Sequence, residues 1–174
     1  MEHVVALHVS ISGLKPNSVL HRFDSAHATF VAQAQAAYAA GYGTEAPPCA
    51  VLIWPDLDRV GWVFMPWRDE FEQDAMLCGL EAMIRADGVG IYSIVGEMWT
   101  AEIEPEDVDK PLKPDDYPDR QERLHILTCT RGREPLRTSF EILPGRKLGA
   151  PVHSTGLCGG RMTDLFGETG RTMQ

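Results

Sequence analysis

Apolar and polar residues alternate at the start of the chain, over residues 5–11. A period of two predicts a β-strand with one buried face. The period then changes to about four, and Asp24 or Ser25 can cap a helix that runs to about Ala40. A second helix is predicted over residues 69–86, because an N-cap aspartate precedes apolar side chains that recur at helical spacing.

The remaining apolar runs are short and bounded by Pro, Gly or Asp, which predicts strands. They cover residues 49–54, 60–65, 89–103, 121–130 and 134–143. The chain is therefore predicted to be an α+β domain with the order β-α-β-β-α-β-β-β. Its five- or six-stranded sheet should be largely antiparallel and packed against two main helices. From the first helix onward this order resembles profilin-like and roadblock-like domains, an analogy that carries no function by itself.

The hydrophobic periodicity fades after Pro144. Residues 149–174 contain six glycines: Gly149, Gly156, Gly159, Gly160, Gly167 and Gly170. Residues 1–148 are therefore predicted to form a single domain, and residues 149–174 a flexible glycine-rich tail.

Composition narrows the class of protein. The hydrophobic share of 44% and the charged share of 24% are those of a globular domain. A formal net charge of −9 argues against a nucleic-acid partner, and no stretch reaches the length of a membrane span. Cys49, Cys78 and Cys129 fall in predicted elements and should be buried as free thiols, which suits a reducing, cytoplasmic location.

Most of the negative charge lies in one segment. Residues 102–119 carry eight acids against two lysines, and four prolines interrupt the segment. A long acidic loop is predicted there, able to attract a basic partner. Its proposed interaction residues are Asp107, Asp109, Asp115 and Asp116. Changing these four to Asn should slow association with such a partner.

The most distinctive motif begins with Glu97-Met98-Trp99 and continues, from the end of the acidic loop, with Pro114-Asp115-Asp116-Tyr117-Pro118-Asp119-Arg120-Gln121-Glu122. This segment resembles a family of uncharacterised bacterial and phage proteins, over roughly residues 91–130. Because that family has no assigned activity, the resemblance implies no mechanism.

Two interpretations of Glu97 follow from its place on an otherwise apolar strand face. In one, Glu97, Asp119 and Glu122 hold Mg²⁺ or Mn²⁺, or act with His125 in acid–base chemistry, as in a metal-dependent hydrolase or nuclease-like enzyme. In the other, Glu97 forms a structural ion pair with Arg120 or Arg123 across the sheet.

Trp62 and Phe64 share one face of the first predicted hairpin, either as core or as an exposed aromatic patch. The chain has no cofactor fingerprint, nucleophile–base motif or metal-ligand spacing, so no cofactor is expected. The leading prediction is a non-enzymatic interaction or accessory domain, binding another protein or itself. The metal-dependent enzyme is the alternative.

Overall fold

The computed structural model describes residues 22–41, 48–54, 59–100, 119–155, 162 and 165–166. Within them the chain forms two helices and six strands, which confirms the α+β class. The described order begins with a helix, because the strand predicted over residues 5–11 lies outside the described residues. The four aspartates proposed for interaction in the acidic loop also lie outside them.

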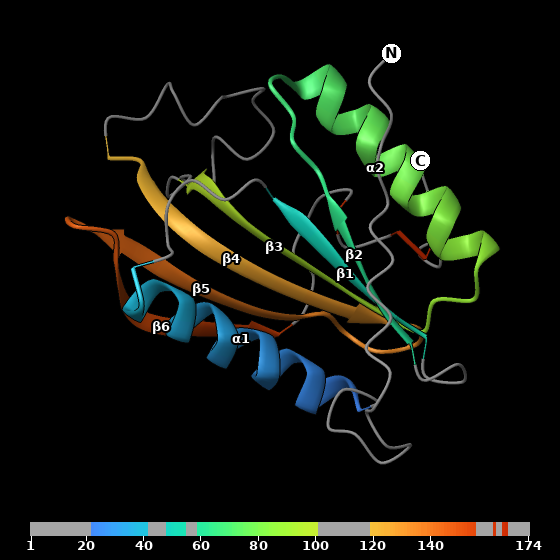
Figure 1. Cartoon of the computed structure of the whole chain (residues 1–174), viewed down its shortest axis with the longest axis horizontal. Coiled ribbons are helices and arrows are strands. Elements are labelled where there is room, and N and C mark those ends of the chain that lie inside the picture. Colours follow the sequence, from blue (N-terminus) through green and yellow to red (C-terminus); the bar gives the residue numbers. More distant parts are fainter. Residues whose placement is uncertain are drawn as a thin grey trace, which may run out of the picture.

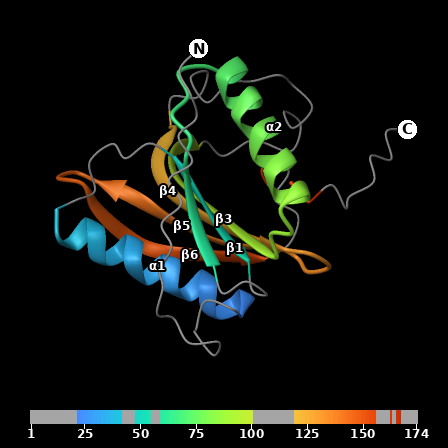
Figure 2. The same ribbon diagram turned by 45° about the vertical axis from the view of Figure 1, so that its right-hand side comes forward.

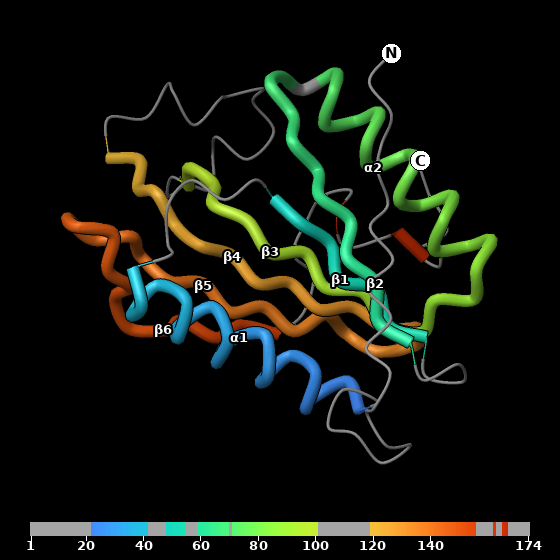
Figure 3. The backbone as a smooth tube through the Cα atoms, viewed as in Figure 1, coloured from blue at the N-terminus to red at the C-terminus, as the bar shows by residue number. Residues whose placement is uncertain are grey.

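All neighbouring strands in the sheet are antiparallel, in the order β2-β1-β3-β4-β5-β6. The strands are β1 (Cys49–Trp54), β2 (Arg59–Phe64), β3 (Ile91–Thr100), β4 (Gln121–Thr130), β5 (Leu136–Leu143) and β6 (Lys147–Thr155). Figure 3 shows the twisted sheet in backbone outline. The two edges of the sheet are therefore β2 and β6.

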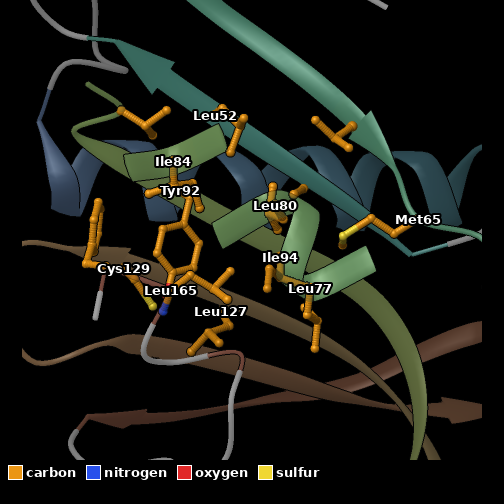
Figure 4. Close-up of a cluster of buried hydrophobic side chains, with 14 of the residues drawn as sticks. Leu52, Met65, Leu77, Leu80, Ile84, Tyr92, Ile94, Leu127, Cys129 and Leu165 are labelled. Atoms are coloured by element: carbon orange, nitrogen blue, oxygen red, sulfur yellow. The ribbon is translucent and has the colours of Figure 1, made fainter. Parts of the chain in front are cut away.

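Helix α2 (Glu70–Ala86) covers one face of the sheet. Asp69 caps it as predicted, since its carboxylate accepts a hydrogen bond of 2.8 Å from the Glu72 backbone N–H. The apolar side of the helix packs against alternate residues of β1 and β3, together with Leu127 and Cys129 of β4. Figure 4 shows Leu80 and Ile84 of the helix among these strand side chains.

Helix α1 (Phe23–Ala39) lies on the other side of the sheet and contacts β4, β5 and β6 (Figures 1 and 2). Phe23 and Phe30 are buried against the face that carries Val51 and Ile53, the neighbours of the residues that face α2. The prediction that Asp24 or Ser25 caps this helix is wrong. The N-cap residue is Arg22, which makes no capping side-chain bond.

The prediction that residues 149–174 form a tail is also wrong at its start. Residues 149–155 belong to β6, which pairs with β5 as an edge strand. The side chains of β6 are largely exposed, so the strand shows no buried period. Of the rest of the predicted tail, Met162, Leu165 and Phe166 are described, and they pack against the core beneath α2.

The cysteine predictions are confirmed in part. Cys129 is buried and Cys49 is partly buried, where burial raises the pKa of the Cys49 thiol to about 11. The prediction of a buried Cys78 is wrong, since this residue is exposed on α2.

Candidate functional site

Glu97 lies on the α1 side of the sheet, where the register of β3 places it opposite Leu124 of β4. Its side chain is only 13% exposed. Two donors meet one of its carboxylate oxygens. Tyr38, in the last turn of α1, donates its hydroxyl hydrogen, and Arg146 donates from its guanidinium.

Arg146 comes from the turn between β5 and β6, far from Glu97 in sequence. Figure 3 shows this turn at the same end of the molecule as the last turn of α1. The guanidinium bridges two carboxylates, because its other nitrogen donates to Glu122 of β4 at 3.2 Å. The backbone of Arg146 has a φ of 59°, in the left-handed region that residues other than glycine rarely adopt. The bonds to Glu97 and Glu122 stabilise a conformation that costs about 1 kcal/mol or more.

Tyr38 and Arg146 both keep their protons at ordinary pH. Burial, followed by the hydrogen bond and charge of Glu97, raises the pKa of Tyr38 far above its usual value. The hydrogen bond to Glu97 likewise raises the pKa of Arg146. Tyr38 therefore remains a donor and Arg146 a cation. Together these charge-assisted bonds join α1, β3, β4 and the β5–β6 turn.

The residues suggested for metal binding are only partly brought together. Glu97 and Glu122 share Arg146, whereas Asp119 is exposed in the turn before β4 and His125 faces the α2 side. No group of three or more His, Cys, Asp or Glu residues among the described residues could hold a metal ion.

The ion pair of Glu97 was predicted with the wrong arginine. Arg120 stacks over the Trp99 ring at 4.9 Å, and Arg123 bonds to Ser139 on the opposite face of the sheet. The partner, Arg146, follows a proline and a glycine in a tight turn. No local pattern in the sequence indicates its contact with Glu97.

A second polar cluster was not predicted at all. His27 of α1 is buried and bonds through both ring nitrogens, to Thr128 of β4 and Thr138 of β5, each at 2.8 Å. Thr128 continues to Ser93 at 3.0 Å, and Thr138 to the exposed His153 of β6 at 2.9 Å. This chain of hydroxyls and imidazoles ties α1 to four strands. Because Ser93, Thr128 and Thr138 are fully buried, none of them is accessible as a nucleophile.

The aromatic pair of the first hairpin differs in burial. Trp62 is partly buried and packs against the core on the α1 side, whereas Phe64, at the end of β2, is 50% exposed. Phe64 is therefore exposed enough to contact another molecule. Only part of the Trp62 side chain is exposed in this way.

No helix in the part of the chain that the structure describes has the length and apolar character needed to cross a membrane. A comparison with known proteins finds no matching family model, no matching curated protein and no matching solved structure. The function is therefore argued from the arrangement of the chain's own residues.

Proposed function

We propose that this chain is a non-enzymatic interaction domain that associates with a second copy of itself through strand β2. The observation that carries the proposal is the half-exposed Phe64 on an edge strand that lacks the usual protection against pairing. Within the described residues, β2 pairs with β1 alone, so its other side presents unpaired backbone groups.

The apolar character of β2 supports the proposal. On the α1 side, exposure increases along the strand, from 7% at Val60, through the partly buried Trp62, to 50% at Phe64. Gly61, between them, is held against the Trp54 ring, where an added Cβ would lie 3.0 Å from a ring carbon. The end of the strand therefore offers an aromatic surface that is continuous with the core.

The opposite edge of the sheet is built differently. β6 carries Lys147 at its start and Pro151 in its interior, and its side chains are largely exposed. Proline and lysine are residues that natural proteins place on edges to prevent pairing. β2 also begins with a basic residue, Arg59, but it has no proline and no further charged side chain up to Phe64. The contrast favours β2 as the edge that takes a partner.

A second copy fits this edge because an antiparallel strand can pair with itself about a twofold axis. Pairing through β2 would continue the sheet across both copies. It would place the Phe64 side chains of the two copies on the same face of that sheet. Main-chain hydrogen bonds and aromatic burial would then act together, as in other cases of strand addition.

The enzyme alternative has less support. The shared oxygen of Glu97 already accepts from Arg146 and Tyr38, and His125 lies on the other face of the sheet. The acidic-loop surface remains a prediction about residues outside the described ones. The resemblance to an uncharacterised bacterial and phage family supplies no activity.

The test is the oligomeric state of Phe64→Lys. Burial of one phenylalanine contributes about 1.5–3 kcal/mol, and a symmetric dimer loses this contribution twice. The dimer dissociation constant, measured by sedimentation equilibrium, should therefore rise by about 100-fold or more.

Phe71→Lys is the matched control, because Phe71 is 82% exposed and belongs to α2, not to the proposed pairing strand. This variant should associate as the unchanged protein does. A monomeric unchanged protein at 100 μM, a concentration chosen well above a roughly micromolar dissociation constant, would refute the proposal. Equal weakening by both substitutions would refute it as well.

A further inference from the structure

A basic cluster lies on the α2 side of β4 and β5, apart from the sites described above. Leu127 and Cys129 belong to the core beneath α2, so the alternation of β4 places Arg123 and His125 on this same face. Across the ladder, Ser139 lies opposite His125, and Arg137 lies opposite Leu127. The cluster thus consists of two arginines, an imidazole and a hydroxyl on adjacent strands.

His125 has an assigned tautomer and an unused donor. Arg137 donates to its Nδ1 from Nε at 3.3 Å and from a terminal nitrogen at 3.1 Å. Since guanidinium nitrogens only donate, Nδ1 accepts and the proton of the neutral ring lies on Nε2. His125 is 5% exposed, and its Nε2 is buried with no hydrogen-bond partner within the described residues.

The neutral state of the ring has a physical cause. Burial, and then the positive charges of Arg137 and Arg123, lower the pKa of His125 to about 4. Near neutral pH the ring therefore carries one N–H, and that N–H has no acceptor among the described residues. An unsatisfied buried donor is costly and is uncommon in a folded protein.

Arg123 adds donors at the same place. It is half-buried, and its guanidinium reaches two neutral oxygens, Oγ of Ser139 at 3.3 Å and the side-chain oxygen of Gln121 at 3.4 Å. Both distances are long for hydrogen bonds. Glu141 lies directly opposite Arg123 on the ladder, but its side chain is exposed and forms no ion pair with Arg123.

We propose that Arg123, His125 and Ser139 form a binding site for a phosphate group, and that Arg137 positions His125 by holding its Nδ1. A guanidinium, an imidazole N–H and a hydroxyl are donors that a tetrahedral dianion can satisfy together, and arginine pairs with phosphate through two parallel bonds. The group would give the His125 Nε2–H an acceptor and replace the weak contacts of Arg123. This site is independent of the proposed association through β2.

The experiment is an NMR titration of the full chain with inorganic phosphate at pH 7, following the ring signals of His125 and the Nε–H signals of the arginines. We expect a saturable shift of the His125 Nε2–H signal. Arg123→Gln should weaken binding at least about tenfold, the usual cost of losing a charge-assisted bond. Arg137→Gln should weaken it as well, because the bonds of Arg137 to Nδ1 hold the His125 proton on Nε2. Backbone spectra of both variants establish that they are folded.

The matched control is Arg133→Gln, because Arg133 pairs with Asp24 of α1, on the other side of the sheet from His125. It should bind phosphate as the unchanged protein does. Phenyl phosphate identifies the source of the group. Tighter binding of the ester points to a phosphorylated molecule, and tighter binding of inorganic phosphate points to the free ion. The absence of saturation, equal weakening in Arg133→Gln, or equal affinity for acetate at the same ionic strength would overturn the proposal.

Discussion

At the scale of single residues, the Glu97–Arg146 pair is the contact whose loss should be most visible. Glu97 is nearly buried, and Arg146 is about one-third exposed. Removing one partner of a fully buried pair costs about 3–5 kcal/mol, and partial exposure of Arg146 reduces that figure. Glu97→Gln should therefore lower the free energy of unfolding by about 2 kcal/mol, measured by urea denaturation. Glu141→Gln, at an exposed position of β5, should change it by less than about 0.5 kcal/mol.

Arg146→Gly distinguishes the contribution of the ion pair to stability from the cost of the strained backbone at residue 146. Glycine adopts a positive φ readily, so this change removes the strain at φ 59° while it also removes the guanidinium. It should therefore cost about 1 kcal/mol less than Glu97→Gln, and the double variant should cost less than the sum of the two. Strict additivity of the two losses would show that the pair contributes nothing to stability.

At the scale of elements, His27 holds α1 on the sheet through Thr128 and Thr138. Burial is the main cause that lowers the pKa of His27, the nearby His153 lowers it further, and Asp24 partly opposes them. The folded-state pKa then lies below the unfolded value of about 6.5. The stabilisation is therefore complete above about pH 6.5 and is lost as the pH falls from there toward the lowered pKa.

The measurement is the difference in unfolding free energy between the unchanged protein and His27→Gln from pH 7.5 to 5. This single group should contribute a slope of at most about 1.4 kcal/mol per pH unit, which the variant should lack. The protection factors of the α1 amides, which are corrected for the intrinsic exchange rate at each pH, should fall over the same range. Parallel curves for the two proteins would contradict the assignment.

The elements differ in how well the sequence predicts them, for a physical reason. The N-cap residue of α2, Asp69, is recognisable in the sequence. The N-cap residue of α1, Arg22, makes no capping side-chain bond. The position of α1 is set by Phe23, Phe30 and His27, which contact the sheet. β6 was missed because an exposed edge strand has no buried face, and therefore no hydrophobic period to detect.

At the scale of the whole molecule, the candidate site was predictable only where it lies within one element. The apolar neighbours of Glu97 mark it as an unusual acid, but its partners Tyr38 and Arg146 lie 59 and 49 residues away along the chain. The same holds for the bonds of His27 to β4 and β5, more than 100 residues away. Such contacts depend on strand order and on which face each helix covers, which local periodicity does not encode.

The two proposals respond to salt in opposite directions, which tests them on the intact molecule. Each copy carries a formal net charge of −9, so two copies repel each other at low ionic strength. Association through an apolar edge should therefore strengthen as sodium chloride shortens the screening length from about 14 Å at 50 mM to about 4 Å at 500 mM. Phosphate binding beside Arg123 and Arg137 should weaken over the same range. A dimer that dissociates at high salt would show that charge pairs, and not the aromatic end of β2, hold the copies together.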